Sequence, residues 1–467
     1  MLRHRTSSRR LASGPTASGT RPGPILGQAP RILGALAAAA GALLLGCAQS
    51  DAPAARRTGA ADIGTTEVRR HVETLASDAF EGRGAGYPGE EKTAAYIEGQ
   101  FRKIGLRPAG DPSPEGRTFL QQFRFPPRGP DVPGQILTSR NVVGLLEGDD
   151  PSRRDEIVVL GAHHDGQGLD GQADTDRQPA QGGPASDIIW NSADDNASSV
   201  AALIEVARSM TQGGLPHHRT ILFVTFGAEE HALNGSVRFV TDPPVPLERL
   251  TAMVNLEKIG RAPGQDLAAA ATGTCACWDG ILAAANAATG FKVASAIAEV
   301  VPDTDHYPFA ALGIPAIVLG TIHQEDTHRP SDSSDKIDYE RLAARTRFAR
   351  AVLLDLANRA EAPRFASGKQ HDLGMVPVVA SESELRVLNL PAGSRALKIS
   401  AVIPGLRADR AGLRPGDVVI GIDGRSVPGD ADGEALQEAA DASAAGVRIS
   451  VARQGRQDVI ALPRGGA

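Results

Sequence analysis

The stretch IVVLGAHHDG, residues 157–166, is the most informative about the fold of the larger part of the chain. Its first four residues are apolar, which predicts a buried strand, and two histidines and an aspartate follow shortly after. Similar apolar runs recur at 141–146, 221–226, 251–256 and 314–319. Helical stretches alternate with these runs, at 197–210, 278–288 and 339–358. The alternation predicts an α/β fold with a mixed, mostly parallel sheet sandwiched by helices.

Composition limits the class of protein. The chain has 467 residues, of which 41% are hydrophobic and 4% aromatic, enough for two or three domains with cores of their own. Collagen, a coiled coil and wholesale disorder are excluded. The formal net charge is −6, and the first 46 residues hold six Arg and no acid, so the remainder is more acidic still. This charge argues against a nucleic-acid partner.

The N-terminus has the pattern of an export signal. A basic stretch precedes an apolar run, Ile32 to Leu45, which is as long as a secretory signal core and too short for a comfortable membrane span. The run ends in LLLGC, residues 43–47, which resembles a bacterial lipoprotein signal. We therefore predict a signal peptide at 1–46, lipidation of Cys47 and a flexible tether at 47–62. A later start, a signal without lipid, and a free thiol ending a buried helix are the alternatives.

These features predict where the protein is found. It would be exported to the cell envelope, periplasmic or associated with the outer membrane, with a lipid anchor as its only membrane contact. Cys275 and Cys277, in TGTCACWDG, are the two cysteines besides Cys47. A C-x-C pair closes too small a loop for a relaxed disulfide, and no second Cys or His pair lies nearby to complete a metal site. We predict a loop of small residues without chemistry.

The segment EAPRFASGKQ, residues 361–370, reads as a linker between two domains. A large domain is expected at 63–360 and a smaller one at 371–464. The smaller domain has short strands with turn signals and one expected helix, at 433–443.

Metal-competent side chains follow several strands of the large domain. The carboxyl ends of strands in an open α/β sheet form the crevice in which ligands bind. Histidines and carboxylates that converge without thiolates suit a hydrolytic pair of Zn²⁺ ions with an open position for water. The residues of this group are His163, Asp165, Asp194, Asp195, Glu229, Glu230, Glu257, His328 and Asp332.

These residues lie in motifs that resemble the M28 family of zinc peptidases, of the bacterial leucyl-aminopeptidase type, over roughly residues 63–358. Upstream, FEGRGAGYPGEE at 80–91 is similar to the family's N-terminal segment. The five ordered motifs are GAHHD at 161–165, SADDNASS at 192–199, FGAEE at 226–230, NLEKIG at 255–260, and DTDHYPF with HRPSD at 303–309 and 328–332.

The resemblance implies roles for individual residues. Glu229 would be the general base. Asp165 would accept a hydrogen bond from the second ring N–H of His163. Glu257 stands where aminopeptidases of the family often have Asp. Mn²⁺ or Co²⁺ would tolerate the same ligands. Five residues would hold two zinc ions: His163 and Glu257 on one, Glu230 and His328 on the other, and Asp194 between them.

The C-terminal part contains RAGLRPGDVVIGIDGRSV, residues 410–427. This stretch resembles a PDZ domain of bacterial envelope proteases. The resemblance implies that a peptide C-terminus could bind at LGMVP, residues 373–377, and add as a strand. A PDZ fold that serves only to pack against the larger domain is the alternative.

Together the motifs predict a secreted or lipid-anchored dinuclear zinc aminopeptidase that hydrolyses N-terminal residues from peptides. A glutaminyl cyclase on the same scaffold, which uses one zinc, is one alternative, and a catalytically inert PDZ-bearing scaffold protein is another. The M20 peptidases share the ligand order, but the segment between Glu257 and His328 is too short for their inserted domain.

Overall fold

The computed structural model describes residues 62–127, 135–169, 187–261, 267–321, 325–366, 373–380, 382–391, 394–427, 446–453 and 455–463, with residues 436, 439 and 442. The expected signal peptide, Cys47 and most of the tether lie outside these residues, as do part of the linker and most of the helix expected at 433–443. No helix among the described residues is both long and apolar enough to cross a membrane.

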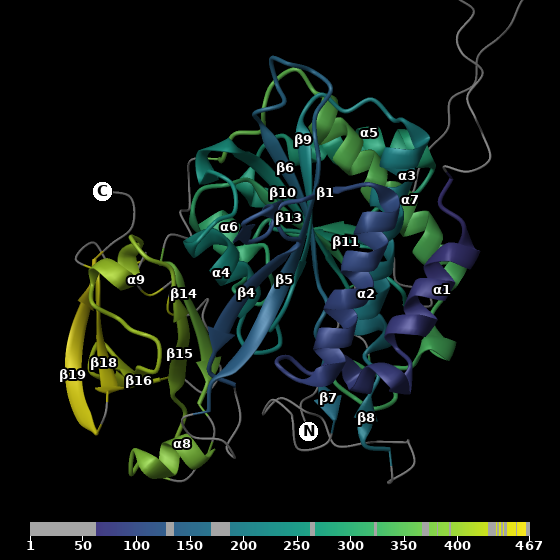
Figure 1. Ribbon diagram of the computed structural model, residues 1–467. Coiled ribbons are helices and arrows are strands. Elements are labelled where there is room, and N and C mark those ends of the chain that lie inside the picture. Colours follow the sequence, from purple (N-terminus) through teal and green to yellow (C-terminus); the bar gives the residue numbers. More distant parts are fainter. Residues whose placement is uncertain are drawn as a thin grey trace, which may run out of the picture. The chain divides into compact units, whose positions relative to one another are not determined.

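A mixed sheet of nine described strands organises the large domain (Figure 1). Its strand order is β1-β5-β9-β6-β10-β13-β11-β12, and β4 pairs with β5. The strands are β1 (Arg107–Pro108), β4 (Leu120–Phe125), β5 (Leu137–Leu146), β6 (Ile157–His163), β9 (Thr220–Phe226), β10 (Leu250–Glu257), β11 (Ala268–Ala270), β12 (Ser295–Ala296) and β13 (Ala316–Gly320).

The centre of this sheet is parallel and its flanks are largely antiparallel. β9, β6, β10 and β13 run in one direction, whereas β5 pairs antiparallel with β9 and β11 pairs antiparallel with β13. Every residue of β6 and β9 is buried, which explains why their sequences are continuous apolar runs. The expected mixed α/β sheet is confirmed. The carboxyl ends of the four parallel strands meet at one edge.

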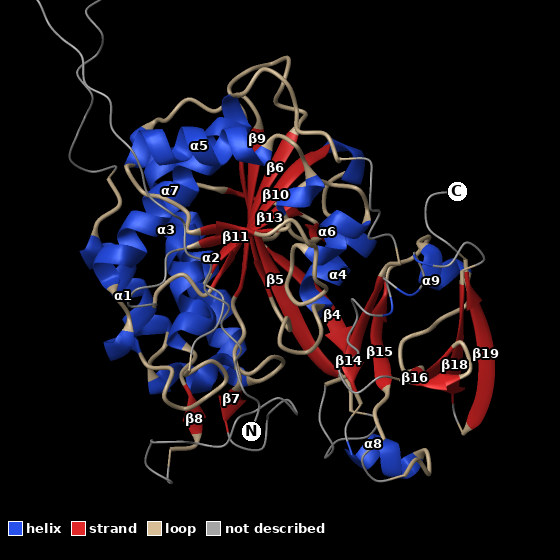
Figure 2. Cartoon of the chain, turned by 180° about the vertical axis from the view of Figure 1, so that it is seen from behind, coloured by secondary structure: helices blue, strands red, loops and turns tan. Residues whose placement is uncertain are grey.

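Helices cover both faces of the sheet, as two opposite views show (Figures 1 and 2). One face carries α1, α2, α3, α5 and α7, and the other carries the shorter α4 and α6. Alternate residues of β6 serve the two cores, with Val158 and Leu160 in the first and Ile157 and Val159 in the second. The helices are α1 (Thr65–Leu75), α2 (Pro88–Ile104), α3 (Ser199–Gly213), α4 (Asn234–Thr241), α5 (Trp278–Thr289), α6 (Tyr307–Ala311) and α7 (Tyr339–Asn358).

Short elements connect the sheet and helices. Two small hairpins pair β2 with β3 and β7 with β8. Their strands are β2 (Pro112–Ser113), β3 (Gly116–Arg117), β7 (Gly168–Leu169) and β8 (Ile189–Trp190). The short helical segments are η1 (Asp78–Arg83), η2 (Ala193–Ser198), η3 (Leu247–Arg249), η4 (Thr272–Thr274) and η5 (Ser334–Lys336).

The C-terminal domain is a second, antiparallel sheet with the order β14-β15-β16-β18-β19, and β17 pairs with β16. Its own core contains Met375, Leu397, Ile399, Val419 and Ile449. Alternation along β15 is strict, with every second residue buried. Its elements are β14 (Met375–Val379), α8 (Glu382–Val387), β15 (Leu397–Val402), α9 (Arg407–Arg410), β16 (Val418–Ile422), β17 (Arg425–Ser426), β18 (Val447–Arg453) and β19 (Arg456–Leu462).

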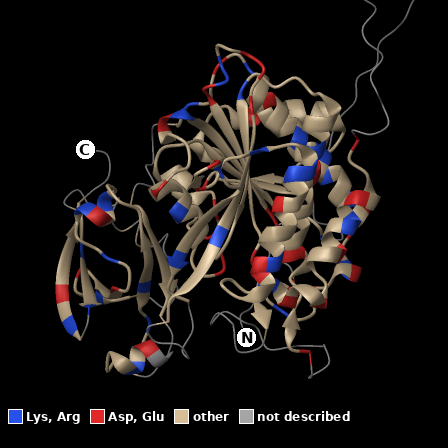
Figure 3. Ribbon diagram, viewed as in Figure 1, with Lys and Arg blue, Asp and Glu red and all other residues tan. Residues whose placement is uncertain are grey.

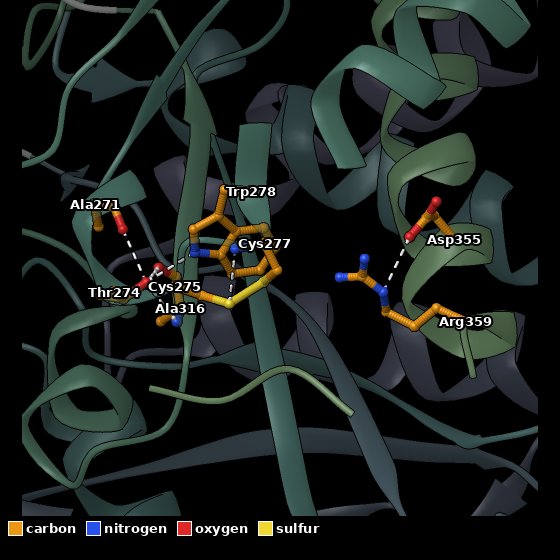
Figure 4. Close-up of a disulfide and its surroundings, with 8 residues drawn as sticks. All are labelled: Ala271, Thr274, Cys275, Cys277, Trp278, Ala316, Asp355 and Arg359. Carbon is orange, nitrogen blue, oxygen red and sulfur yellow. Dashed lines mark hydrogen bonds and ion pairs between the residues drawn. A yellow bond between two sulfur atoms is a disulfide. The ribbon is translucent and has the colours of Figure 1, made fainter. Parts of the chain in front are cut away.

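The prediction for the C-x-C pair was wrong, because Cys275 and Cys277 form a disulfide (Figure 4). The chain is extended at Cys275 and helical at Cys277, so their Cα atoms lie 5.1 Å apart, within the range that a disulfide spans. The Trp278 indole N–H donates to Thr274 Oγ1, 2.9 Å away, and holds the loop against the start of α5. Sequence separation alone was a poor guide to the Cα separation.

Charges are interspersed on the helical side of the large domain (Figure 3). Exposed acidic and basic side chains pair one turn apart, as in Arg102 with Glu98 on α2, at 2.6 Å, and Arg69 with Glu73 on α1, at 3.3 Å. Such exposed pairs each contribute about 0.3–0.5 kcal/mol. They keep these surfaces polar rather than carrying the stability of the fold.

A buried polar cluster joins α1, α2 and α3. His71 Nε2 lies 3.3 Å from Glu205 Oε1, and His71 Nδ1 lies 2.8 Å from the Tyr96 hydroxyl. Burial lowers the pKa of His71. The pKa of Glu205 is also lowered, because hydrogen bonds from His71 and Arg208 outweigh the opposing effect of burial. Both groups therefore take up protons less readily when folded than when unfolded.

This cluster predicts loss of stability in mild acid. Below about pH 6.5, His71 is protonated in the unfolded chain but resists protonation in the folded chain, so the free energy of unfolding falls as pH drops through this window. Glu205 acts in the same direction at lower pH. We expect His71→Gln to flatten the decline in Tm between about pH 7 and pH 5. Thermal unfolding followed by circular dichroism measures it, with the exposed Arg69→Gln on the same helix as control. An unchanged slope in His71→Gln would contradict this reading.

Candidate metal centre

The ends of three neighbouring parallel strands bring charged side chains to one edge of the sheet. β6 ends at His163, which pairs in register with Phe226, the last residue of β9. Glu229 and Glu230 follow β9 after two residues, and Glu257 ends β10. Because these strands are parallel neighbours, their carboxyl ends lie side by side.

Two histidines face each other across one aspartate. His163 Nε2 lies 3.2 Å from Asp195 Oδ1, and His328 Nε2 lies 3.2 Å from Asp195 Oδ2. On the first side, Glu257 Oε1 is 3.4 Å from His163 Nε2. On the second side, Glu230 Oε2 is 3.1 Å from His328 Nε2. The described residues thus form two metal-competent groups that share Asp195: His163 with Glu257, and His328 with Glu230.

The structure places Asp195, and not the expected bridging residue Asp194, between the two histidines. Asp194 Oδ1 instead accepts hydrogen bonds from the backbone N–H groups of Gly260, at 2.6 Å, and Arg261, at 3.2 Å. It also accepts one from Ser198 Oγ, at 3.1 Å. Consecutive side chains leave an irregular turn in different directions, and the spacing of the motif does not show which of the two points at the histidines.

Asp332 fixes the turn that carries Asp195. Its carboxylate accepts the backbone N–H groups of both Asp194 and Asp195, each at 3.0 Å. The peptide bond between Asp195 and Asn196 is cis. Asp332 lies four residues after His328, so one short loop supplies a histidine to the centre and holds the aspartate opposite it.

Asp165 contacts its predicted partner chiefly through its backbone. The carbonyl oxygen of Asp165 lies 3.2 Å from His163 Nδ1, whereas its carboxylate Oδ1 lies 3.7 Å away. Both oxygens can only accept, so a ring proton belongs on Nδ1, and Nε2 faces the carboxylates. The carboxylate of Asp165 meanwhile accepts the N–H groups of Glu229, at 3.1 Å, and Glu230, at 3.2 Å.

The electrostatics of the centre favour a cation. Burial alone would lower the pKa of His163, yet the carboxylates of Glu229 and Glu257 raise it well above its usual value. Burial opposes protonation of His328 as well, and Glu230 and Asp195 still raise its pKa to about 11. Carboxylates and imidazole nitrogens that face one another inside a buried site require a proton or a metal ion between them. The donor set fits a divalent metal.

Two residues that the sequence analysis missed hold Glu257 in place. Asn196 Nδ2 lies 3.3 Å from Glu257 Oε2 and also donates to the carbonyl of Leu256, at 3.1 Å. Thr304 Oγ1 donates to the same carboxylate oxygen, at 3.1 Å. Both lie inside quoted motifs, SADDNASS and DTDHYPF, but neither side chain is a typical metal ligand.

Arg83 is a third missed residue, and it ties the loops of the centre together. Its buried guanidinium donates to the carbonyls of His164, at 3.1 Å, of Asn191 and Ser192, each at 2.7 Å, and of Leu75, at 2.8 Å. Gly82, with φ of 63°, allows this approach, because a Cβ there would lie 2.5 Å from two backbone oxygens. The motif FEGRG therefore serves as a clamp between β6 and the turn that carries Asp195.

The chain is similar in sequence to known proteins. Residues 141–353 match the family model Peptidase family M28, and residues 398–453 match that of the PDZ domain. The Escherichia coli K12 alkaline phosphatase isozyme conversion protein is 27% identical over 175 residues, covering 38% of this chain and 44% of that protein. Aminopeptidase YwaD of Bacillus subtilis is 25% identical over 273 residues, covering 56% and 54%. The chain spans about half the length of these curated relatives.

Solved structures of aminopeptidases are similar at low identity. An aminopeptidase from Aneurinibacillus sp. strain AM-1 superposes with a TM-score of 0.49 and 19% identity, covering 65% of this chain and 95% of that one. The zinc aminopeptidase BSAP of Bacillus subtilis gives 0.48 and 18%, covering 66% and 99%. LapA of Legionella pneumophila gives 0.48 and 20%, covering 64% and 73%.

Proposed function

The chain carries an M28 peptidase domain followed by a PDZ domain, and on that premise we propose that it is a dinuclear zinc aminopeptidase. The observation that carries the proposal is Asp195, whose two carboxylate oxygens each face the Nε2 atom of a different histidine at 3.2 Å. A carboxylate in that position can bind two cations at once. The names of the curated relative YwaD and of BSAP agree with this activity.

The ligand assignment follows from the two groups. His163, Asp195 and Glu257 would hold one ion, and Asp195, Glu230 and His328 the other. Nitrogen and oxygen donors without thiolates suit zinc, and Mn²⁺ or Co²⁺ would accept the same set. Bound there, the metals would polarise the scissile carbonyl and lower the pKa of water. With three protein ligands each, the ions would have room to bind water and substrate.

Glu229 has the position of a general base. Its Oε2 lies 3.9 Å from His163 Nε2, at the edge of the centre, and its backbone N–H is held by Asp165. Burial raises the pKa of Glu229 well above its usual value, and the carboxylates of Glu257 and Asp305 add to the effect. A carboxylate with a raised pKa can take the proton of the attacking water and later return it to the leaving amine.

The expected export signal and the PDZ domain complete the proposal. The protein would act in the cell envelope, tethered through lipid on Cys47, with peptides as substrates and a peptide C-terminus as a ligand of the PDZ domain. The glutaminyl cyclase alternative needs only one zinc ion. The two metal-competent groups that share Asp195 favour two zinc ions instead. The inert-scaffold alternative is disfavoured because the described residues supply three ligand side chains for each ion.

Metal content and hydrolysis test the proposal together. We expect two zinc ions per chain and release of the anilide from aminoacyl anilides, abolished by a chelator and restored by added zinc. The readouts are elemental analysis of the purified protein and absorbance of the released aniline, over a panel of N-terminal residues. One zinc with cyclisation of N-terminal Gln would establish the cyclase instead. Absence of bound metal would overturn the enzymatic proposal.

A further inference from the structure

Lys258 lies inside the metal centre, although its position after a strand would ordinarily send it to solvent. Its Nζ is 2.6 Å from Glu257 Oε1 and 3.7 Å from Asp195 Oδ2. The side chain is 22% exposed. The ammonium group of Lys258 is thus a cation that lies among the carboxylates to which the proposed function assigns zinc.

The backbone directs the lysine there. Lys258 has φ of 50°, in the left-handed region that non-glycine residues seldom adopt. Its N–H donates to Asn196 Oδ1, at 2.9 Å, and its carbonyl accepts a hydrogen bond from Thr321 Oγ1. These contacts on both sides hold the turn, so the side chain lies over Glu257 rather than continuing the strand.

The lysine and a metal ion compete for the same oxygens. Glu257 Oε1, the partner of Nζ, is also the oxygen that faces His163 Nε2 at 3.4 Å. Like charges that share an oxygen ligand repel strongly where burial weakens screening. An ammonium group beside Glu257 and Asp195 therefore opposes the binding of a second cation by the same carboxylates.

The competition is unequal between the two groups. Lys258 contacts Glu257, which belongs only to the group of His163, and approaches shared Asp195 at a longer distance. We propose, resting on the proposed function, that Lys258 is a positioning residue whose charge weakens metal binding at His163–Asp195–Glu257, so that the group of Glu230 and His328 fills first.

Zinc affinity tests the proposal directly. The full-length apoprotein is titrated with Zn²⁺ against a chromophoric chelator, which gives two dissociation constants. In wild type we expect two unequal constants. In Lys258→Met the weaker constant should tighten about tenfold while the stronger one changes less, and Lys258→Arg, which keeps the charge, should resemble wild type.

A second background assigns the weaker site. In His328→Ala the remaining zinc should be held by His163, Asp195 and Glu257, and adding Lys258→Met should tighten it. Three outcomes would each overturn the role of the lysine. They are equal zinc dissociation constants in wild type, no tightening of zinc binding in Lys258→Met, and equal weakening of zinc binding in Lys258→Met and Lys258→Arg. Those outcomes leave zinc binding and anilide hydrolysis intact, whereas an apoprotein that binds no zinc would overturn the proposed function itself.

Discussion

Glu229→Gln is expected to retain both zinc ions and to lose about 10²–10⁴-fold in kcat. Glutamine keeps the size of the side chain and a hydrogen-bonding oxygen but cannot take a proton from water. Because the anchoring bond to Asp165 comes from the backbone N–H of residue 229, the substitution leaves that bond in place. The measurements are kcat and KM on the best aminoacyl anilide, with zinc content determined on the same samples.

A matched control for Glu229→Gln removes a carboxylate outside the centre. Glu248 lies on η3, before β10, and is exposed, so Glu248→Gln should leave kcat and zinc content unchanged. Glu229 also belongs to a third metal-competent group, with His163 and Glu230. Full turnover in Glu229→Gln would remove its role as base. Loss of zinc would instead make Glu229 a ligand.

Much of the sheet could be predicted because burial on both faces leaves a direct trace in sequence. The apolar runs at 157–160 and 221–226 correspond to β6 and β9, and the polar residues that follow them lie at one edge because parallel strands end together. The antiparallel β4 gave no such run. Its residues alternate between buried and exposed or intermediate positions, a weaker signal over six residues.

The centre was less predictable wherever the backbone turns. Asp194 and Asp195 are chemically identical neighbours, and the choice between them depends on a turn held by Asp332 from a distant loop. Lys258 and His328 both have positive φ, which sequence patterns do not reveal for non-glycine residues. The disulfide likewise depends on local backbone angles at Cys275 and Cys277. The metal-binding chemistry could be inferred from the residue types, whereas the direction in which each side chain points required the structure.

The same substitution at the neighbours Asp194 and Asp195 is expected to have very different effects on zinc binding and turnover. Asp195→Asn should lose at least one zinc ion and nearly all turnover. An amide offers one acceptor oxygen where the carboxylate offers two, so either His163 or His328 would face an NH₂ group. Even residues that only hydrogen-bond to metal ligands cost about 10–100-fold in metal affinity when removed, so we expect at least about 100-fold weaker zinc binding.

Asp194→Asn is the matched control for that loss. Its Oδ1 can still accept from Gly260, Arg261 and Ser198, so the loop after β10 keeps its anchor. Burial raises the pKa of Asp194 to about 6, and a neutral amide at this position removes a buried charge. The variant should therefore keep two zinc ions and most of its turnover, with at most a shift in Tm, because the new NH₂ group is buried. If Asp194→Asn loses zinc while Asp195→Asn retains it, the bridge is Asp194 and the geometry of the centre must be reassigned.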